Sequence, residues 1–164
     1  MCKIYILGAV GSGKTTLAKK LSNDLNIRYY ELDNVVWKHC YNGDIRRNDK
    51  EISEIFSEII DNESWIIENV GKKCFDDGLE KADTIIYLKL SPLTLYRRIF
   101  FRWIKQKINL EPSPYKADLK MLKQMYLWAK KEINNSKLKE LERFNKKIII
   151  LDEKKLKHYK YNCQ

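Results

Sequence analysis

The chain has 164 residues and a formal net charge of +10, with 44% hydrophobic and 33% charged residues. This length and balance predict one soluble, globular domain over residues 1–164 that buries its own core. The longest apolar runs have four or five residues, which excludes a bilayer-spanning helix and a membrane partner.

The cysteines and the start of the chain predict a cytoplasmic protein. Four cysteines are scattered, without a C-x-x-C pair, as is typical of reduced thiols in the cytoplasm. The first predicted strand already starts at residue 3, so no signal peptide is expected. The net charge of +10 suits anionic partners, which include nucleotides and nucleic acid, but a lysine-rich solvated surface is the simpler explanation.

The first predicted elements are a strand and a helix joined by a glycine-rich turn. Residues 3–7 are apolar and rich in β-forming side chains, and residues 17–25 carry apolar side chains at helical spacing. The turn between them fits the pattern G-x-x-x-x-G-K-[ST]. Its glycines let consecutive N–H groups and the helix N-terminus point at a phosphate. The sequence therefore predicts a P-loop for a nucleoside triphosphate, formed by Gly8, Gly11, Ser12, Gly13, Lys14, Thr15 and Thr16.

The middle of the chain alternates strands and helices. A second strand is expected over residues 28–32, ending at Asp33, followed by a polar, irregular segment over residues 34–47. Asn48 with Glu51 predicts a capped helix whose apolar positions run from residue 52 to residue 60. A third strand at residues 65–67 ends at Glu68. A loop bracketed by Gly71 and Gly78 then leads to a fourth strand over residues 84–88.

The last third is mainly helical. Pro92 opens a helix that runs to about Lys107. The core-facing side chains that we expect on it are Tyr96, Ile99, Phe100, Trp103 and Ile104. A proline-containing insert follows, then a long helix from about residue 119, extended or restarted through residue 141. A fifth strand over residues 147–151 and a basic tail complete the chain.

The strand cores are almost continuously apolar, as expected when helices cover both faces of a parallel sheet. Ligands of such α/β sheets collect at the carboxyl ends of the strands. Gly8, Asp33 and Glu68 all lie at predicted carboxyl ends. This edge is therefore where we expect chemistry.

Five segments give the chain a family resemblance. They are residues 4–16, 30–37, 65–68 and 98–107, with a weaker match at 42–47. The chain resembles small P-loop kinases of the adenylate-kinase-like group, and more closely the bacterial topology modulation (FlaR-type) proteins. The resemblance implies a three-layer P-loop fold with five parallel strands in the order 2-3-1-4-5. It also implies a short helical lid over about residues 98–118 and MgATP as donor.

Phosphoryl transfer requires positioning and charge neutralisation, and this assigns roles to individual residues. Lys14 would hold the β- and γ-phosphates, and the Thr15 hydroxyl would hold Mg²⁺. By resemblance, Asp33 is the candidate base or acceptor anchor, with a turn or cap aspartate as the alternative. Glu68 would contact the metal through water or contact the acceptor, or it is a plain surface carboxylate.

Four arginines are further candidates. Arg98 and Arg102 lie on one helical face, and the resemblance implies that they close over the transferring phosphate as lid arginines. A solvated basic face is their alternative. Arg46 and Arg47 would bind an anionic group of the acceptor or simply face solvent.

Two classes of function follow. The first is a kinase for a small-molecule, nucleoside or nucleotide acceptor. The second is a nucleotide-binding regulatory protein associated with DNA, and a nucleic-acid 5′-hydroxyl kinase would bridge the two. GTP is disfavoured because the chain has no D-x-x-G segment and residues 145–148 depart from N-K-x-D at the aspartate.

Overall fold

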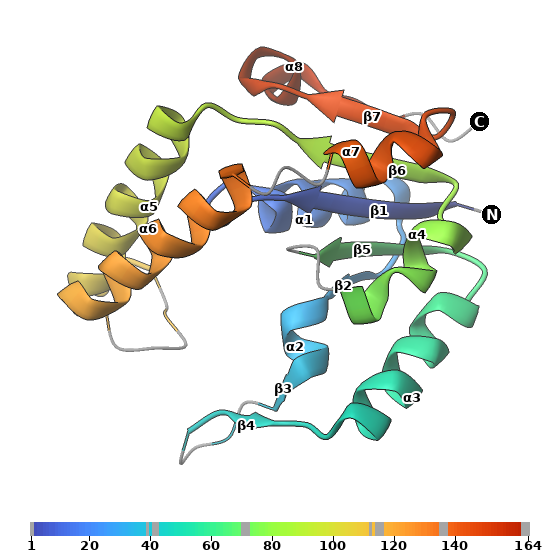
Figure 1. Cartoon of the computed structure of the whole chain (residues 1–164), viewed down its shortest axis with the longest axis horizontal. Helices are drawn as coiled ribbons and strands as arrows, with labels where there is room; N and C mark the ends of the chain where they lie inside the picture. The colour runs from blue at the N-terminus through green and yellow to red at the C-terminus, as the bar shows by residue number, and fades with distance from the viewer. Residues whose placement is uncertain are drawn as a thin grey trace.

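A five-stranded parallel sheet organises the computed structural model, which describes residues 2–38, 40, 43–69, 73–111, 113, 117–134 and 138–161 (Figure 1). The strands are β1 (Lys3–Gly8), β2 (Tyr29–Glu31), β5 (Trp65–Asn69), β6 (Thr84–Leu88) and β7 (Ile148–Leu151). Their spatial order is β2-β5-β1-β6-β7. Counted among these five strands alone, this is the predicted order 2-3-1-4-5. The α/β fold class is confirmed.

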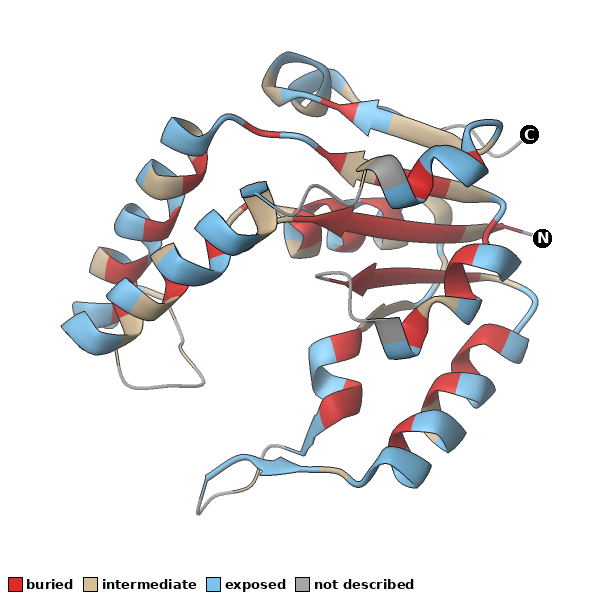
Figure 2. Ribbon diagram, in the orientation of Figure 1, coloured by how far each residue is buried: buried red, intermediate tan, exposed pale blue. Residues whose placement is uncertain are grey.

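Helices cover both faces of the sheet, which gives three layers. One face packs against α2 (Leu32–Val36), α3 (Asp49–Asp61), α4 (Asp77–Lys81) and α7 (Leu138–Leu141). The other face packs against α1 (Lys14–Leu25) and α8 (Glu153–His158). In β1, Tyr5 and Leu7 join the first core, whereas Ile4 and Ile6 join the second. The apolar residues of β1 are therefore buried on both sides, as Figure 2 shows for the central strands.

A helical hairpin extends from the carboxyl edge of the sheet (Figure 1). It consists of α5 (Pro92–Lys107) and α6 (Leu119–Asn134), and α5 begins as predicted, with Ser91 capping the Thr94 N–H. A third core cluster holds the two helices together through Ile99, Trp103 and Leu122. The predicted lid, residues 98–118, is the second half of α5 and its connection to α6. Phe100 was expected in the core, but 41% of it is exposed because it lies outside this seam.

The segment that follows β2 differs from the prediction. The second strand is shorter than expected and ends at Glu31, so Asp33 lies in the first turn of α2 and not at a strand end. The segment over residues 34–47 is not irregular. It contains the end of α2 and an antiparallel pair, β3 (Trp37–Lys38) and β4 (Ile45–Arg46). Residues 39, 41 and 42 lie outside the described chain.

Short helices also replace the loop predicted between Gly71 and Gly78. A 3₁₀ turn, η1 (Lys73–Phe75), leads into α4, and Gly78 is a buried residue of that helix. Gly71 lies outside the described residues. A second 3₁₀ turn, η2 (Glu142–Phe144), follows α7. The capping box of α3 is present as predicted, with Asn48 and Glu51 each accepting from the other's N–H. Among the described residues, no helix is both long and apolar enough to cross a bilayer.

Candidate phosphate site at the carboxyl edge of the sheet

The P-loop joins β1 to α1 and forms a cradle of backbone N–H groups. Gly11 and Gly13 have φ angles of 78° and 95°, in the left-handed region that favours glycine. The helical hydrogen bonds of α1 begin with the Leu17 N–H, which donates to the Gly13 carbonyl at 3.0 Å. The N–H groups of the preceding residues, from Lys14 to Thr16, therefore point out of the helix end. This arrangement is suited to an anion.

Lys14 lies within the cradle. Only 7% of the residue is exposed, and its Nζ donates to the Ala9 carbonyl at 3.1 Å. Burial lowers the pKa of the Lys14 ammonium, and the carboxylates of Glu68, Glu132 and Asp33 oppose that shift, Glu68 most strongly. Lys14 is therefore a buried cation at the P-loop whose charged form is favoured by carboxylates from three other elements.

Glu68, on β5, connects the neighbouring strand to the P-loop. The Thr15 hydroxyl donates to its Oε1 at 3.2 Å, and 8% of Glu68 is exposed. Burial raises the pKa of the Glu68 carboxyl, and the nearby Lys14 partly offsets that shift. Within the described chain, Glu68 Oε2 and Ser12 Oγ are buried without a hydrogen-bond partner. Because Mg²⁺ takes hydroxyl and carboxylate oxygens, Thr15 and Glu68 fit a site for this ion.

Asn69 follows Glu68 and is fixed by a buried network. Its Nδ2 donates to the Tyr5 hydroxyl at 2.8 Å, and that hydroxyl donates to the Phe75 carbonyl at 3.1 Å. Burial raises the pKa of Tyr5, which keeps the hydroxyl protonated and able to donate. The network ties the end of β5 to η1, beside the carboxylate of Glu68. Asn69 was not predicted as a site residue from the sequence.

The predicted acceptor residues lie on and beside α2. Asp33 is exposed and close enough to act electrostatically on Lys14 and Glu68. Arg47 Nη1 donates to the carbonyls of Asn34 and Val35, at 2.7 and 3.1 Å, and so caps the helix that carries Asp33. Arg46 forms an exposed ion pair with Asp49 at 2.8 Å.

The two predicted lid arginines differ in their contacts. Arg98 Nη1 donates to the Ser12 carbonyl at 2.8 Å, so this guanidinium already touches the P-loop. Arg102 Nε pairs with Glu111 at 3.4 Å across the end of the hairpin. Its charge still lowers the pKa of Lys14, which places it within electrostatic range of the cradle.

The structure adds a residue that sequence analysis missed. Glu132, near the end of α6, accepts a hydrogen bond from the Val10 N–H at 2.7 Å. It continues the spacing of the buried α6 residues Leu122, Met125 and Ala129. A carboxylate on the core-facing stripe of an amphipathic helix is the signal that would have identified it.

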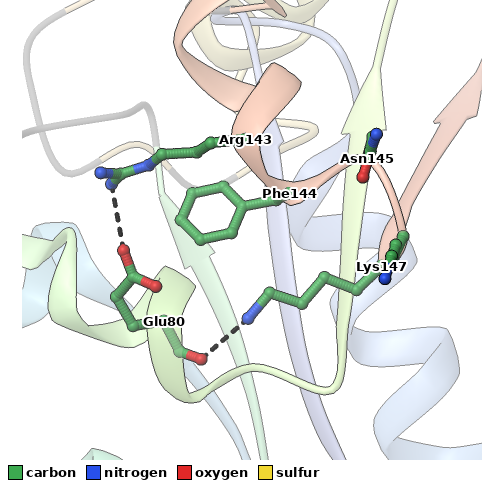
Figure 3. Close-up of a pocket in the computed structure, with 6 residues that line it drawn as sticks. Glu80, Arg143, Phe144, Asn145 and Lys147 are labelled. Atoms are coloured by element: carbon green, nitrogen blue, oxygen red, sulfur yellow. Dashed lines mark hydrogen bonds and ion pairs between the residues drawn. The ribbon is translucent and has the colours of Figure 1, made fainter.

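An open pocket lies at the opposite, amino-terminal edge of the sheet, and its side chains hold the end of α4 in place (Figure 3). Its lining includes Lys147, whose Nζ donates to three carbonyls at the end of α4, those of Leu79, Glu80 and Ala82, at 2.8, 2.8 and 3.0 Å. An ammonium group has three N–H donors, so Lys147 has none left for a ligand. Arg143 pairs with Glu80 at 3.3 Å.

Comparisons with known proteins agree with this geometry. A family model for the AAA domain matches residues 4–116, more than half of the chain. A shikimate kinase from Bacteroides fragilis is 28% identical over 119 residues, which cover 60% of this chain and 62% of that protein. An adenylate kinase from Borrelia duttonii is 33% identical over 85 residues, or 49% of this chain and 35% of that protein. The chain thus matches less than two thirds of the length of either relative.

Solved structures extend the likeness to the fold. A sugar kinase from Janibacter sp. superposes with a TM-score of 0.54 at 19% identity, covering 93% of this chain and 85% of that one. At this identity the likeness establishes the fold alone. The closer resemblance to topology modulation proteins stays a prediction.

Proposed function

Since the chain belongs to the AAA domain family of P-loop proteins, we propose that it is a phosphotransferase that uses MgATP. It moves the γ-phosphoryl group to a hydroxyl or phosphate of a small-molecule, nucleoside or nucleotide acceptor. The observation that carries the proposal is the convergence on one cradle of a buried lysine, a Thr15–Glu68 pair and Arg98. The relatives named above are kinases of small molecules and nucleotides by their names.

The chain's own residues divide the work. The amides from Gly11 to Thr16 and the Lys14 ammonium bind and orient the donor phosphates. Thr15 and Glu68 would hold Mg²⁺, which when bound neutralises phosphate charge. We assign Arg98 to stabilise the charge on the transferring group and Arg102 to approach from the lid, since a guanidinium stays charged and can bind two oxygens.

Asp33 is the residue we assign to the acceptor. Its carboxylate is exposed beside the cradle, where it can orient an acceptor hydroxyl and take its proton. Arg47 fixes the helix on which Asp33 stands. Contacts of Arg46 and Arg47 with an anionic group of the acceptor remain part of the proposal.

The test is ADP release from MgATP over a panel of metabolites, nucleosides and nucleotides. We expect release to depend strongly on one acceptor and to be abolished by Lys14→Ala with the fold retained. Lys19→Ala, which removes an exposed charge from the same helix, is the matched control. Normal turnover in Lys14→Ala would exclude the assigned site.

A second prediction concerns Asp33 alone. Asp33→Asn keeps the size of the side chain but cannot take a proton, so we expect kcat to fall far more than the affinity for MgATP. Steady-state kinetics and calorimetry on the same variant measure the two quantities. An equal loss of both would contradict an acceptor role.

The net charge of +10 suits two alternatives, a nucleotide-binding regulatory protein associated with DNA and a nucleic-acid 5′-hydroxyl kinase. Salt-dependent duplex binding that survives Lys14→Ala, together with no acceptor in the metabolite panel, would favour the regulatory protein. ADP release that requires a 5′-hydroxyl end would favour the nucleic-acid kinase.

A further inference from the structure

The end of α6 lies against the P-loop, far from it in sequence (Figure 1). The Val10 side chain packs on the cluster formed by α5 and α6, and the Val10 N–H donates to Glu132 Oε2 at 2.7 Å. Arg98, on α5, holds the Ser12 carbonyl two residues further on. Both helices of the hairpin therefore form a side-chain hydrogen bond with the backbone of the P-loop.

Glu132 also acts on the phosphate-binding lysine. After Glu68, it is the carboxylate that most strongly favours the charged form of Lys14, raising the pKa that burial lowers. An anion-binding cradle of N–H groups and an ammonium attracts whichever anion is within reach. In this chain the Glu132 carboxylate, which is partly buried, is such an anion.

A nucleoside triphosphate brings like charge to the same place. The donor phosphates would bind the Lys14 ammonium and the amides that follow Val10, close to the Glu132 carboxylate on the Val10 N–H. Two anions held this close together in a partly buried site repel each other strongly. The carboxylate is therefore expected to leave as the phosphates arrive.

We propose that Glu132 is an internal competitor for the phosphate site, a positioning residue that holds the P-loop before nucleotide binds and sets its affinity for nucleotide. The inference rests on the proposed function, because it requires the cradle to bind a triphosphate. This competition would couple the end of α6 to the occupancy of the P-loop, because the Glu132 carboxylate leaves the Val10 N–H when the phosphates bind.

The test is calorimetric titration of the full chain with MgATP in wild type and Glu132→Gln. Glutamine keeps the shape and a carbonyl oxygen that can accept from the Val10 N–H, and it removes only the charge. We expect Glu132→Gln to bind MgATP roughly five- to tenfold more tightly, with the difference shrinking as salt is raised. Glu140→Gln makes the same charge change on an exposed side chain of α7 and should bind as wild type does.

Unfolding without nucleotide separates this role from a merely structural one. Glu132→Gln should unfold near the wild-type temperature, whereas Glu132→Ala, which loses the acceptor for the Val10 N–H, should unfold at a lower temperature. A structural role alone would change these temperatures but would give no salt-dependent gain in affinity.

The outcomes are distinguishable. If wild type binds MgATP and Glu132→Gln binds equally or more weakly, the competitor is overturned and the proposed function stands. If wild type shows no binding of MgATP, the assigned phosphate site fails and the inference fails with it.

Discussion

At the scale of single residues, the site depends on a buried pair of opposite charges. Burial lowers the pKa of Lys14 and raises that of Glu68, and each group partly offsets the shift of the other. Each charge therefore favours the ionised form of the other. A substitution that removes the Glu68 charge should therefore lower the pKa of Lys14 further.

This coupling gives a pH prediction. In the proposed function, the ammonium form of Lys14 binds phosphate. Because burial lowers the pKa of this ammonium, ATP binding should weaken at a lower alkaline pH than it would with an exposed lysine. Glu68→Gln removes the strongest influence that raises this pKa, so the loss should move to still lower pH. Calorimetry with ATP in EDTA, from neutral pH to about pH 10, measures it without metal contacts.

The control for that experiment is Glu63→Gln, which alters an exposed carboxylate just before the opposite end of β5. Its alkaline profile should match wild type. A Glu68→Gln profile that also matched wild type would contradict the electrostatic coupling of Lys14 to Glu68.

Among the helices and strands, those whose ends are set by residues close by in the sequence could be predicted. The capping box fixed the start of α3, Pro92 the start of α5, and the glycine pattern the P-loop with its helix. The helices α2 and α4 were not predicted because each has only five residues and is stabilised by a side chain from a distant part of the sequence. Arg47 satisfies the carbonyls of α2, and Lys147 those of α4.

The candidate site divides in the same way. The cradle residues lie within one contiguous stretch, so a pattern of eight residues from Gly8 to Thr15, with Thr16 directly after it, predicts them. Glu132 touches Val10 across a separation of 122 residues, and no local pattern encodes that pairing. The contact depends on how the α5–α6 hairpin packs, which is a property of the folded chain.

The helix α4 gives an element-scale prediction of unusual sign. Glycine in a helix interior normally costs about 1 kcal/mol relative to alanine, so Gly→Ala usually stabilises. A Cβ at Gly78 would lie 2.7 Å from Tyr5 Cε2 and 3.0 Å from Phe56 Cζ. Gly78→Ala should therefore destabilise the protein, by about 1–3 kcal/mol, measured as a lower midpoint in urea unfolding. An unchanged or higher midpoint would contradict this prediction and show that Tyr5 and Phe56 can shift to make room for the methyl group.

At the scale of the whole molecule, three parts meet at one edge of the sheet. The strands β1 and β5 supply the P-loop and Glu68, α2 supplies Asp33, and the α5–α6 hairpin supplies Arg98 and Glu132. The net charge of +10 would add a long-range attraction for anionic ligands such as a nucleoside triphosphate. In the proposed function, donor site, acceptor site and lid would therefore come from separate parts of one chain, which is an arrangement suited to the positioning that phosphoryl transfer requires.

A crystal structure with a non-hydrolysable ATP analogue and Mg²⁺ would show directly whether the P-loop binds the donor. We expect the analogue's phosphates on the amides from Gly11 to Thr16, with Lys14 Nζ moved from the Ala9 carbonyl to the phosphates. We also expect the Thr15 hydroxyl to leave Glu68 for the metal. An analogue bound elsewhere, with the Lys14–Ala9 and Thr15–Glu68 hydrogen bonds unchanged, would contradict this expectation.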